Sequence, residues 1–325
     1  DPAPMPATPD IDPAAALHFV INGSAGSQDA EATRQAIETT LASAGRQGEL
    51  HFCDPADLAR TARERAAQAL DERSAVVAVG GDGTINTVAQ AAHAAGCAMG
   101  VVPRGTFNYF ARTHGIATDT AHATAQLLRA HPEPVQVAAV NQQLFLVNAS
   151  VGLYPDLLED RESWKARFGR SQLVALWAAA ATLLRAQRRL RLEIGLEGDV
   201  HDVRTLTLFV GNNRLQLQQL GVLVNHHQEA DNGYVTAVML KPIGTLAMLR
   251  LMARGAMGSL GDDDGIERFE FQDMVVKPPK LMRLRSMKVA FDGEVTRMKP
   301  PLTFRVLSEP LFLLKPTADD AVPPA

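Results

Sequence analysis

The sequence contains few of the residues that mark disulfide-rich or membrane-spanning proteins. It has two cysteines, Cys53 and Cys97, and their spacing is not that of metal ligands or of a disulfide framework. No apolar run reaches the roughly 18 to 20 residues that a bilayer-spanning helix needs, and the nearest candidate, 173–184, is too short. We therefore expect a reduced, cytoplasmic protein that meets a membrane only peripherally, at its inner face.

An excess of charge of one sign is also lacking. The chain carries 32 basic and 36 acidic side chains, a net charge of −4, which gives no general attraction to nucleic acid. Hydrophobic residues make up 46% of the 325 residues, a length that exceeds the usual size of a single core. The sequence therefore predicts two globular domains and no nucleic-acid partner. It gives no indication of the oligomeric state.

In the first part of the chain, short apolar runs alternate with amphipathic segments. Strands are expected at 17–22, 50–53, 76–79 and 99–102, and helices at 29–44, 55–70, 84–95 and 121–130. This alternation predicts an α/β domain with a parallel, Rossmann-like sheet over residues 17–134. Residues 1–16 read as a disordered leader, and 131–134, His-Pro-Glu-Pro, as a hinge or a domain boundary.

Beyond residue 134 the pattern changes to consecutive strands. A hairpin is expected from 135–140 and 144–149, followed by strands at 190–196, 204–210, 235–240, 269–271, 288–291 and 302–306. Helices are expected only at about 160–187 and 242–257. Residues 135–307 are thus predicted to form a mainly antiparallel β domain that presents the substrate, with a disordered tail over 318–325.

The segment Val76–Thr87, VVAVGGDGTINT, is the most specific local pattern. A buried β-branched strand ends abruptly at Gly80 and Gly81, and a helix follows. Glycines let backbone N–H groups approach an anion closely, and Thr84 is suited to cap the helix. Asp82 lies among them, where a carboxylate repels phosphate unless a metal ion or a proton intervenes. The pattern predicts a phosphate-binding turn.

Two further turns follow predicted parallel strands, and one more lies near the end of the chain. NGSAG at 22–26 and PRGTFN at 103–108 are expected at the same carboxyl edge as GGDGT, where ligands of parallel sheets bind. FDGE at 291–294 reads by itself as a hairpin turn, with Asp292 as a turn former.

Together these four pieces, in this order, resemble the diacylglycerol kinase catalytic family, which is related to sphingosine kinases and more distantly to NAD kinases. The resemblance implies ATP as phosphoryl donor and a lipid hydroxyl as acceptor. It implies Glu294 as the base that removes the hydroxyl proton, with Asp82 positioning the phosphate or assisting in activation. It also implies that residues 308–317 return to the first domain. The nucleotide-binding residues that it implies are Asn22, Gly26, Gly80, Gly81, Asp82, Gly83, Thr84, Asn86, Gly105, Thr106 and Asn108.

The sequence departs from the family pattern at three positions. Gly23 stands where the first turn usually has proline, and Tyr109 where the third has an acid. Asn232 stands where an Asp that helps to hold Mg²⁺ is expected, and Asp231 precedes it. We therefore expect Mg²⁺ to arrive with the nucleotide, with Asp231 and Asn232 as the candidate metal residues.

The acceptor leaves alternatives open. Trp164 and Phe168 among four cations at 161–170 suggest a membrane face, as much as an ordinary amphipathic helix. An NAD kinase-like enzyme would share the GGDGT turn, but it lacks a reason for FDGE. A non-catalytic nucleotide or lipid sensor would explain the departures, although Asp82 and Glu294 argue against it. The favoured interpretation is a lipid kinase of unknown lipid specificity.

Overall fold

The computed structural model describes residues 7–23, 27–152, 190–196, 198–213, 233–241, 265–279 and 285–323. The chain divides into two compact units, residues 1–137 with 307–325 and residues 138–306. The first is an α/β unit with a mostly parallel sheet, and the second consists of antiparallel sheets. The predicted fold class is confirmed. The helices expected at 160–187 and 242–257 lie outside the described residues.

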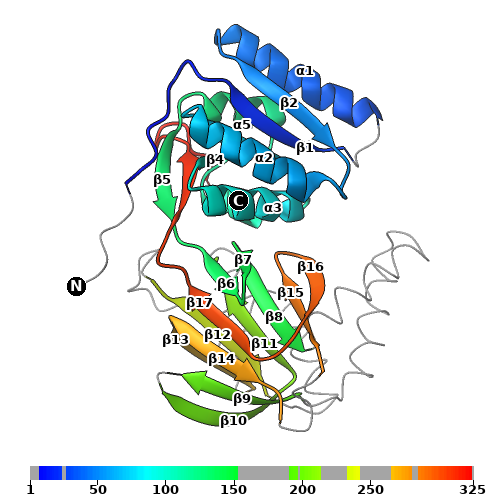
Figure 1. Ribbon diagram of the computed structural model, residues 1–325, viewed down its shortest axis with the longest axis vertical. Coiled ribbons are helices and arrows are strands. Elements are labelled where there is room, and N and C mark those ends of the chain that lie inside the picture. The colour runs from blue at the N-terminus through cyan, green and yellow to red at the C-terminus, as the bar shows by residue number, and fades with distance from the viewer. Residues whose placement is uncertain are drawn as a thin grey trace. The chain divides into compact units, whose positions relative to one another are not determined.

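The first unit contains one six-stranded sheet in the order β2-β1-β3-β4-β18-β5 (Figure 1). Its strands are β1 (Leu17–Asn22), β2 (Gly48–Cys53), β3 (Ala75–Gly80), β4 (Ala98–Pro103), β18 (Leu311–Lys315) and β5 (His131–Val135). The first five are parallel, and β5 is antiparallel to β18. The C-terminal strand β18 therefore lies inside this sheet.

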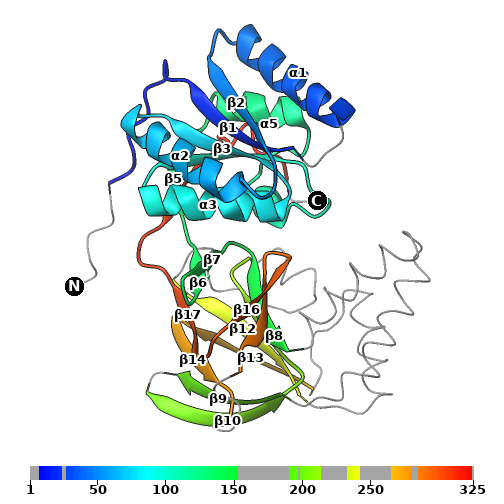
Figure 2. The ribbon, with the colours of Figure 1, turned by 45° about the vertical axis from the view of Figure 1, so that its right-hand side comes forward.

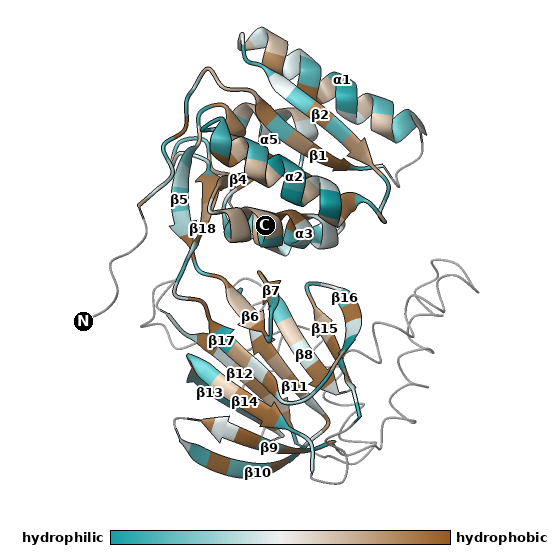
Figure 3. Cartoon of the chain, viewed as in Figure 1, coloured by the Kyte–Doolittle hydropathy of each residue, from teal (hydrophilic) through white to brown (hydrophobic). Residues whose placement is uncertain are grey.

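Helices cover both faces of the sheet. They are α1 (Ser27–Ser43), α2 (Leu58–Asp71), α3 (Asp82–Ala95), α4 (Tyr109–Thr113) and α5 (Thr120–Leu127). Helix α2 packs beside α3, and α1 beside α5 on the opposite face, as Figure 2 shows. Every residue of β3 and β4 is consequently buried. Figure 3 shows the result in hydropathy: β18 is almost entirely hydrophobic, whereas α1 and α2 alternate.

The hinge expected at 131–134 is wrong, because these residues form strand β5. Pro132 pairs with Leu314 and Pro134 with Phe312, so the two prolines occupy alternate positions. Both missing N–H groups therefore fall on the same side of an edge strand, which is where a sheet tolerates proline. The Pro-x-Pro pattern is compatible with this strand because β5 has a neighbour on one side only.

Residues near both ends of the chain contact the first unit. The backbone N–H of Asp12 donates to the carbonyl of Arg73 at 2.7 Å, within the expected disordered leader. In the expected tail, Asp320 accepts two hydrogen bonds from the Arg129 guanidinium, at 2.6 and 2.9 Å. The N–H of Val322 donates to Gly115 O at 2.9 Å. Residues 7–16 and 318–323 thus follow a defined path along this unit.

The second unit contains two six-stranded sheets. One has the order β10-β9-β14-β17-β6-β7 and the other β13-β12-β11-β8-β15-β16. All pairings described within them are antiparallel. The strands are β6 (Ala138–Val140), β7 (Gln143–Phe145), β8 (Asn148–Gly152), β9 (Leu190–Leu196), β10 (Asp199–Thr205), β11 (Thr207–Gly211), β12 (Val235–Leu240), β13 (Ile266–Phe271), β14 (Asp273–Lys277), β15 (Met287–Phe291), β16 (Glu294–Met298) and β17 (Leu302–Val306).

The core of this unit joins the inner faces of the two sheets. Phe145 and Phe304 from one sheet share a buried cluster with Leu208 and Val289 from the other. The expected hairpin over 135–149 is present only as β6 and β7, since the chain then enters the second sheet as β8. Strands β14 and β16 were not predicted. The single strand expected at 204–210 is wrong, because β10 ends at Thr205 and β11 begins at Thr207 in the other sheet. Within the described residues, no helix is long and apolar enough to cross a membrane.

Replacing Phe304 by Ala should destabilise the second unit by about 3–5 kcal/mol, because the side chain is fully buried between the sheets. Denaturant unfolding followed by circular dichroism measures this change. Val200→Ala is the control, since Val200 is 70% exposed, and it should shift the free energy by less than about 0.5 kcal/mol. Equal effects of the two substitutions would contradict this core.

Candidate functional site

The three turns expected in one place do follow neighbouring parallel strands. Strand β1 ends at Asn22, β3 at Gly80 and β4 at Pro103, so the turns share the carboxyl edge of the sheet. Chain order reverses between β1 and β3, because β1 leads outward to β2 and β3 leads outward to β4. Ligands of such sheets bind at this switch point.

The first two turns are joined across the switch point by a hydrogen bond. The Nδ2 group of Asn22 donates to Oγ1 of Thr84 at 3.3 Å. Thr84 is 4% exposed and folds back over Gly80: a Cβ placed on Gly80 would lie 2.6 Å from that of Thr84. Position 80 must therefore lack a side chain for Thr84 to reach Asn22.

Thr84 does not cap helix α3, contrary to the sequence prediction. The helix begins at Asp82 and its N-cap is Gly81, which has extended backbone angles and offers no side-chain acceptor. The extended Gly81 brings the helix start two residues forward, so that Asp82, Gly83 and Thr84 form the first turn. The N–H groups at this positive end of the helix point along its axis, an arrangement suited to phosphate. Asn86 is buried one turn further on.

The third turn packs closely against the second. The N–H of Arg104 donates to Gly80 O at 2.7 Å. A Cβ on Gly105 would lie 3.1 Å from the Cα of Gly81, so the two backbones are in direct contact. The Arg104 guanidinium bonds to Asp29 and Thr33 of α1 and fastens this turn to the helix that follows the first turn. Arg104 was not predicted from the sequence as a residue of this site.

Asn108 shapes the third turn from within. Its backbone is left-handed, with φ 49° and ψ 39°. Its Oδ1 accepts from the N–H of Gly105 at 2.8 Å, and its Nδ2 donates to the carbonyl of Gly105 at 2.9 Å. Both ends of the amide thus hold the loop, while Thr106 is exposed. Thr106 is the better placed of the two for contact with a ligand.

Tyr109 occupies the position of the missing acid and lies beside Asp82. Its ring stacks on Phe107, with centroids 5.7 Å apart and planes 1° from parallel. Burial raises the pKa of the Tyr109 phenol, and the Asp82 carboxylate adds to this rise in pKa while Arg112 opposes it. A neutral phenol can donate a hydrogen bond, but it adds no charge for holding a cation.

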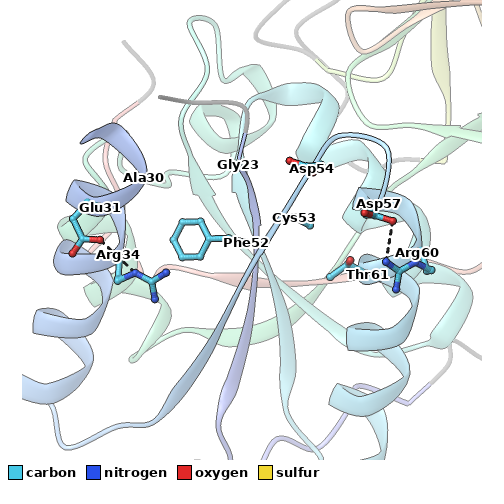
Figure 4. Close-up of a pocket in the computed structure, with 10 residues that line it drawn as sticks. All are labelled: Gly23, Ala30, Glu31, Arg34, Phe52, Cys53, Asp54, Asp57, Arg60 and Thr61. Atoms are coloured by element: carbon cyan, nitrogen blue, oxygen red, sulfur yellow. Dashed lines mark hydrogen bonds and ion pairs between the residues drawn. The ribbon is translucent and has the colours of Figure 1, made fainter. Parts of the chain in front are cut away.

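A hollow of about 700 Å³ lies beside the first turn, at the carboxyl end of β2 (Figure 4). On one side the Arg34 guanidinium lies 4.5 Å over the ring of Phe52. On the other, Arg60 bonds to Asp57 at 2.9 Å. This hollow was not predicted, although Phe52 and Cys53 end a strand at the edge where the three turns were expected. It is lined by Gly23, Ala30, Glu31, Arg34, Phe52, Cys53, Asp54, Asp57, Arg60 and Thr61.

The FDGE motif forms the hairpin turn between β15 and β16 in the second unit. Asp292 has φ 44° and Gly293 φ 90°, and Phe291 pairs with Glu294, so the loop has two residues. The Asp292 carboxylate accepts from the N–H groups of Leu146, Val147 and Asn148 at 2.7, 2.8 and 3.0 Å. Asp292 is thus a turn former, as expected, and also a buried anchor at 5% exposure.

Glu294 opens β16 directly after this anchored turn, and its side chain is exposed. Glu294 and Asp82 belong to different units. Among the other predicted residues, Gly26, Asp231 and Asn232 lie outside the described residues, as does the 161–170 segment.

The first unit contains most of the segment that matches a known protein family. Residues 16–140 match the family model of the diacylglycerol kinase catalytic domain. The predicted resemblance to this family is confirmed over these residues. This segment of the chain contains all three turns, whereas the FDGE motif lies beyond it.

Two curated relatives extend the comparison. A Klebsiella pneumoniae protein named "Probable lipid kinase YegS-like" is 38% identical over 98 residues, which are 29% of this chain and 33% of that protein. The chain therefore aligns with only about a third of that relative. The protein named "Diacylglycerol kinase" in Bacillus subtilis is 28% identical over 246 residues, 71% of this chain and 75% of that protein.

Solved structures share the fold. A crystal structure described as a diacylglycerol kinase from Bacillus anthracis has a TM-score of 0.65 and 19% identity. It covers 93% of this chain and 97% of the other. This structural similarity extends over both units, whereas the match to the family model ends at residue 140.

Asp292→Asn should lower the free energy of unfolding by about 2–4 kcal/mol. Asparagine tolerates the positive φ, but an NH₂ group would face backbone N–H donors that the carboxylate now accepts from. Denaturant titration measures the loss. Asp199→Asn, at an exposed position of β10, is the matched control. If both variants are as stable as the unmodified protein, the carboxylate does not anchor the turn.

Proposed function

We propose that the protein is an ATP-dependent lipid kinase that transfers the γ-phosphate to a lipid hydroxyl. One observation carries the proposal: three small-residue turns meet at the switch point of a sheet that lies in the segment matching the diacylglycerol kinase catalytic domain. Lipid acceptors are suggested by relatives named lipid kinase and diacylglycerol kinase. Membrane contact would be peripheral.

The phosphates of ATP would bind at the N-terminus of α3. The backbone of Asp82–Thr84 offers N–H groups and the positive end of the helix dipole. Gly81 and Gly105 lie against each other beside these N–H groups and have no side chains that would cover them. Thr106 would add a hydroxyl. The hollow between α1 and α2 would take the base or ribose, with Arg34 and Phe52 as an aromatic and cationic wall.

Mg²⁺ would neutralise the phosphate oxygens. Asp82 fits this use, because it supplies a carboxylate at the phosphate end of the site. Tyr109 would not act as a metal ligand in place of the acid that the family has at this position. Asp231 and Asn232 stay sequence predictions for the remaining contacts.

Glu294 would accept the proton of the attacking hydroxyl. In the proposed step the lipid oxygen bonds to the γ-phosphorus, the bond from that phosphorus to the β–γ bridging oxygen breaks, and ADP leaves. The proton passes to the Glu294 carboxylate. The exposed position of Glu294, beside a turn held by three N–H groups to Asp292, supports this role because the carboxylate is accessible while its backbone is fixed.

Glu294→Gln and Asp82→Asn should each reduce phosphate transfer at least about a hundredfold, since one removes the proton acceptor and the other the carboxylate at the phosphates. The assay is transfer from γ-labelled ATP to mixed lipid vesicles that contain diacylglycerol. Glu270→Gln and Asp71→Asn, at exposed positions of β13 and α2, are controls that should keep full activity. Full activity in both site variants would refute the assigned roles. Transfer to NAD and to none of the lipids would refute the proposed acceptor.

Arg34→Ala should raise the KM for ATP about three- to tenfold and leave kcat nearly unchanged. The guanidinium lines the hollow that is proposed for the base or ribose and belongs to none of the three turns, so its loss removes roughly 1 kcal/mol of nucleotide binding and none of the chemistry. Initial rates at varied ATP measure both constants. Arg63→Ala, an exposed arginine of α2 that does not line the hollow, is the control. An unchanged KM in Arg34→Ala would exclude the hollow as part of the ATP site.

A further inference from the structure

Two histidines and two glutamates gather around the beginning of β1, β2 and the end of α2. His18 of β1 pairs in register with Glu49 of β2, and His51 follows two residues later on the same strand. Nδ1 of His18 and Nε2 of His51 each lie 3.5 Å from the Glu49 carboxylate oxygen Oε2. Glu72, directly after α2, contacts His18 from the other side.

The contact with Glu72 determines how a neutral His18 ring is oriented. Its Nε2 lies 2.9 Å from Oε2 of Glu72, and a carboxylate can only accept, so the proton is on Nε2. Nδ1 then carries a lone pair directed toward Glu49. His18 is 0% exposed, and its Nδ1 has no hydrogen-bond partner among the residues the structure describes. A buried polar atom without a hydrogen-bond partner lowers the stability of the fold unless another group or an ion binds it.

His51 presents a second nitrogen of the same kind. Its Nε2 is buried and, within the described parts of the chain, also without a hydrogen-bond partner. The two imidazole nitrogens that face the Glu49 carboxylate therefore both lack a hydrogen-bond partner in the described residues.

We propose that His18, Glu49 and His51 form a Zn²⁺ site in which Glu72 orients His18. Their ligand atoms all lie within 4.8 Å of one another. The separation around tetrahedral zinc is about 3.3 Å. Both contacts of Glu49, at 3.5 Å, are close to this value, and the two imidazole nitrogens would have to approach each other by up to about 1.5 Å. Two imidazoles and one carboxylate are a zinc ligand set, and a carboxylate on the far nitrogen of a ligating histidine is its common second contact. Water would fill the fourth position.

The site is open enough for an ion to enter. The side chains of Glu49 and Glu72 are 49% and 43% exposed, although His18 is buried. The positive charge of Arg65 would disfavour zinc binding here. Its guanidinium donates a hydrogen bond to Gln68 and forms an ion pair with Glu64, both on its own helix. The competing arrangement is His18 held between Glu49 and Glu72 with no metal.

Zinc at this place would stabilise the fold and take no part in phosphoryl transfer. His18 precedes Asn22 by four residues of extended strand, about 13 Å, so the cluster lies toward the opposite edge of the sheet from the three turns. The ion would tie β1 to β2 and, through Glu72, to the end of α2.

The test is calorimetric titration of the tag-free, metal-stripped full chain with ZnCl₂, together with melting curves at rising zinc. We expect the unmodified protein to bind zinc and its Tm to rise with zinc concentration. Glu49→Gln and His51→Gln, both at partly exposed positions, should weaken this binding at least tenfold. His122→Gln, at an exposed position of α5, is the matched histidine control and should bind as the unmodified protein does.

Circular dichroism of each metal-free variant verifies that it folds. Unmodified affinity in either Glu49→Gln or His51→Gln would overturn the site. Absence of zinc binding by the unmodified protein at about 0.1 mM zinc would also overturn it. MgCl₂ in place of ZnCl₂ should give no change in Tm that depends on His51, because Mg²⁺ prefers oxygen ligands.

Discussion

The candidate site depends on one steric constraint, the direct contact of backbone with backbone at the carboxyl edge of the parallel sheet. Gly80 leaves the space that the Thr84 side chain fills, and Gly105 lies against Gly81 with no room for a Cβ between Asn108 and that backbone. Only then can Thr84 bond to Asn22 and Arg104 to Gly80. A single side chain at position 80 or 105 would separate turns that come from three different strands.

The location of this site could be predicted from the sequence, but the contacts that its polar side chains make could not. Alternating strands and helices suffice to locate turns at one edge, because the carboxyl ends of parallel strands are always together. Whether an amide faces a ligand or its own backbone depends on local angles. Asn108 was expected to bind nucleotide, yet its left-handed backbone turns both ends of the amide onto Gly105. The cap of α3 was misassigned because the extended backbone at Gly81 decides where the helix starts.

The parts of the fold that could not be predicted depend on distant pairing. Strand β14 becomes a strand by lying between β9 and β17, which come from far earlier and somewhat later in the chain. Strand β5 contains two prolines and is tolerated only because it is an edge. Similarly, nothing within FDGE indicates that Asp292 reaches the N–H groups of residues 146–148, since the two segments are separated by most of the second unit.

The electrostatic potential differs in sign between the carboxyl edge and the amino edge of the first sheet. At the carboxyl edge, backbone N–H groups and a helix N-terminus create positive potential that an anion can neutralise. Near the amino edge, the buried His18 ring lies between the carboxylates of Glu49 and Glu72, which create negative potential that a cation can neutralise. Because Glu72 lies between α2 and β3, a cation bound there would hold the connection that leads into β3, the strand that ends at Gly80. The same strand would thus be fixed at its entrance by a metal and at its exit by the packing of glycines.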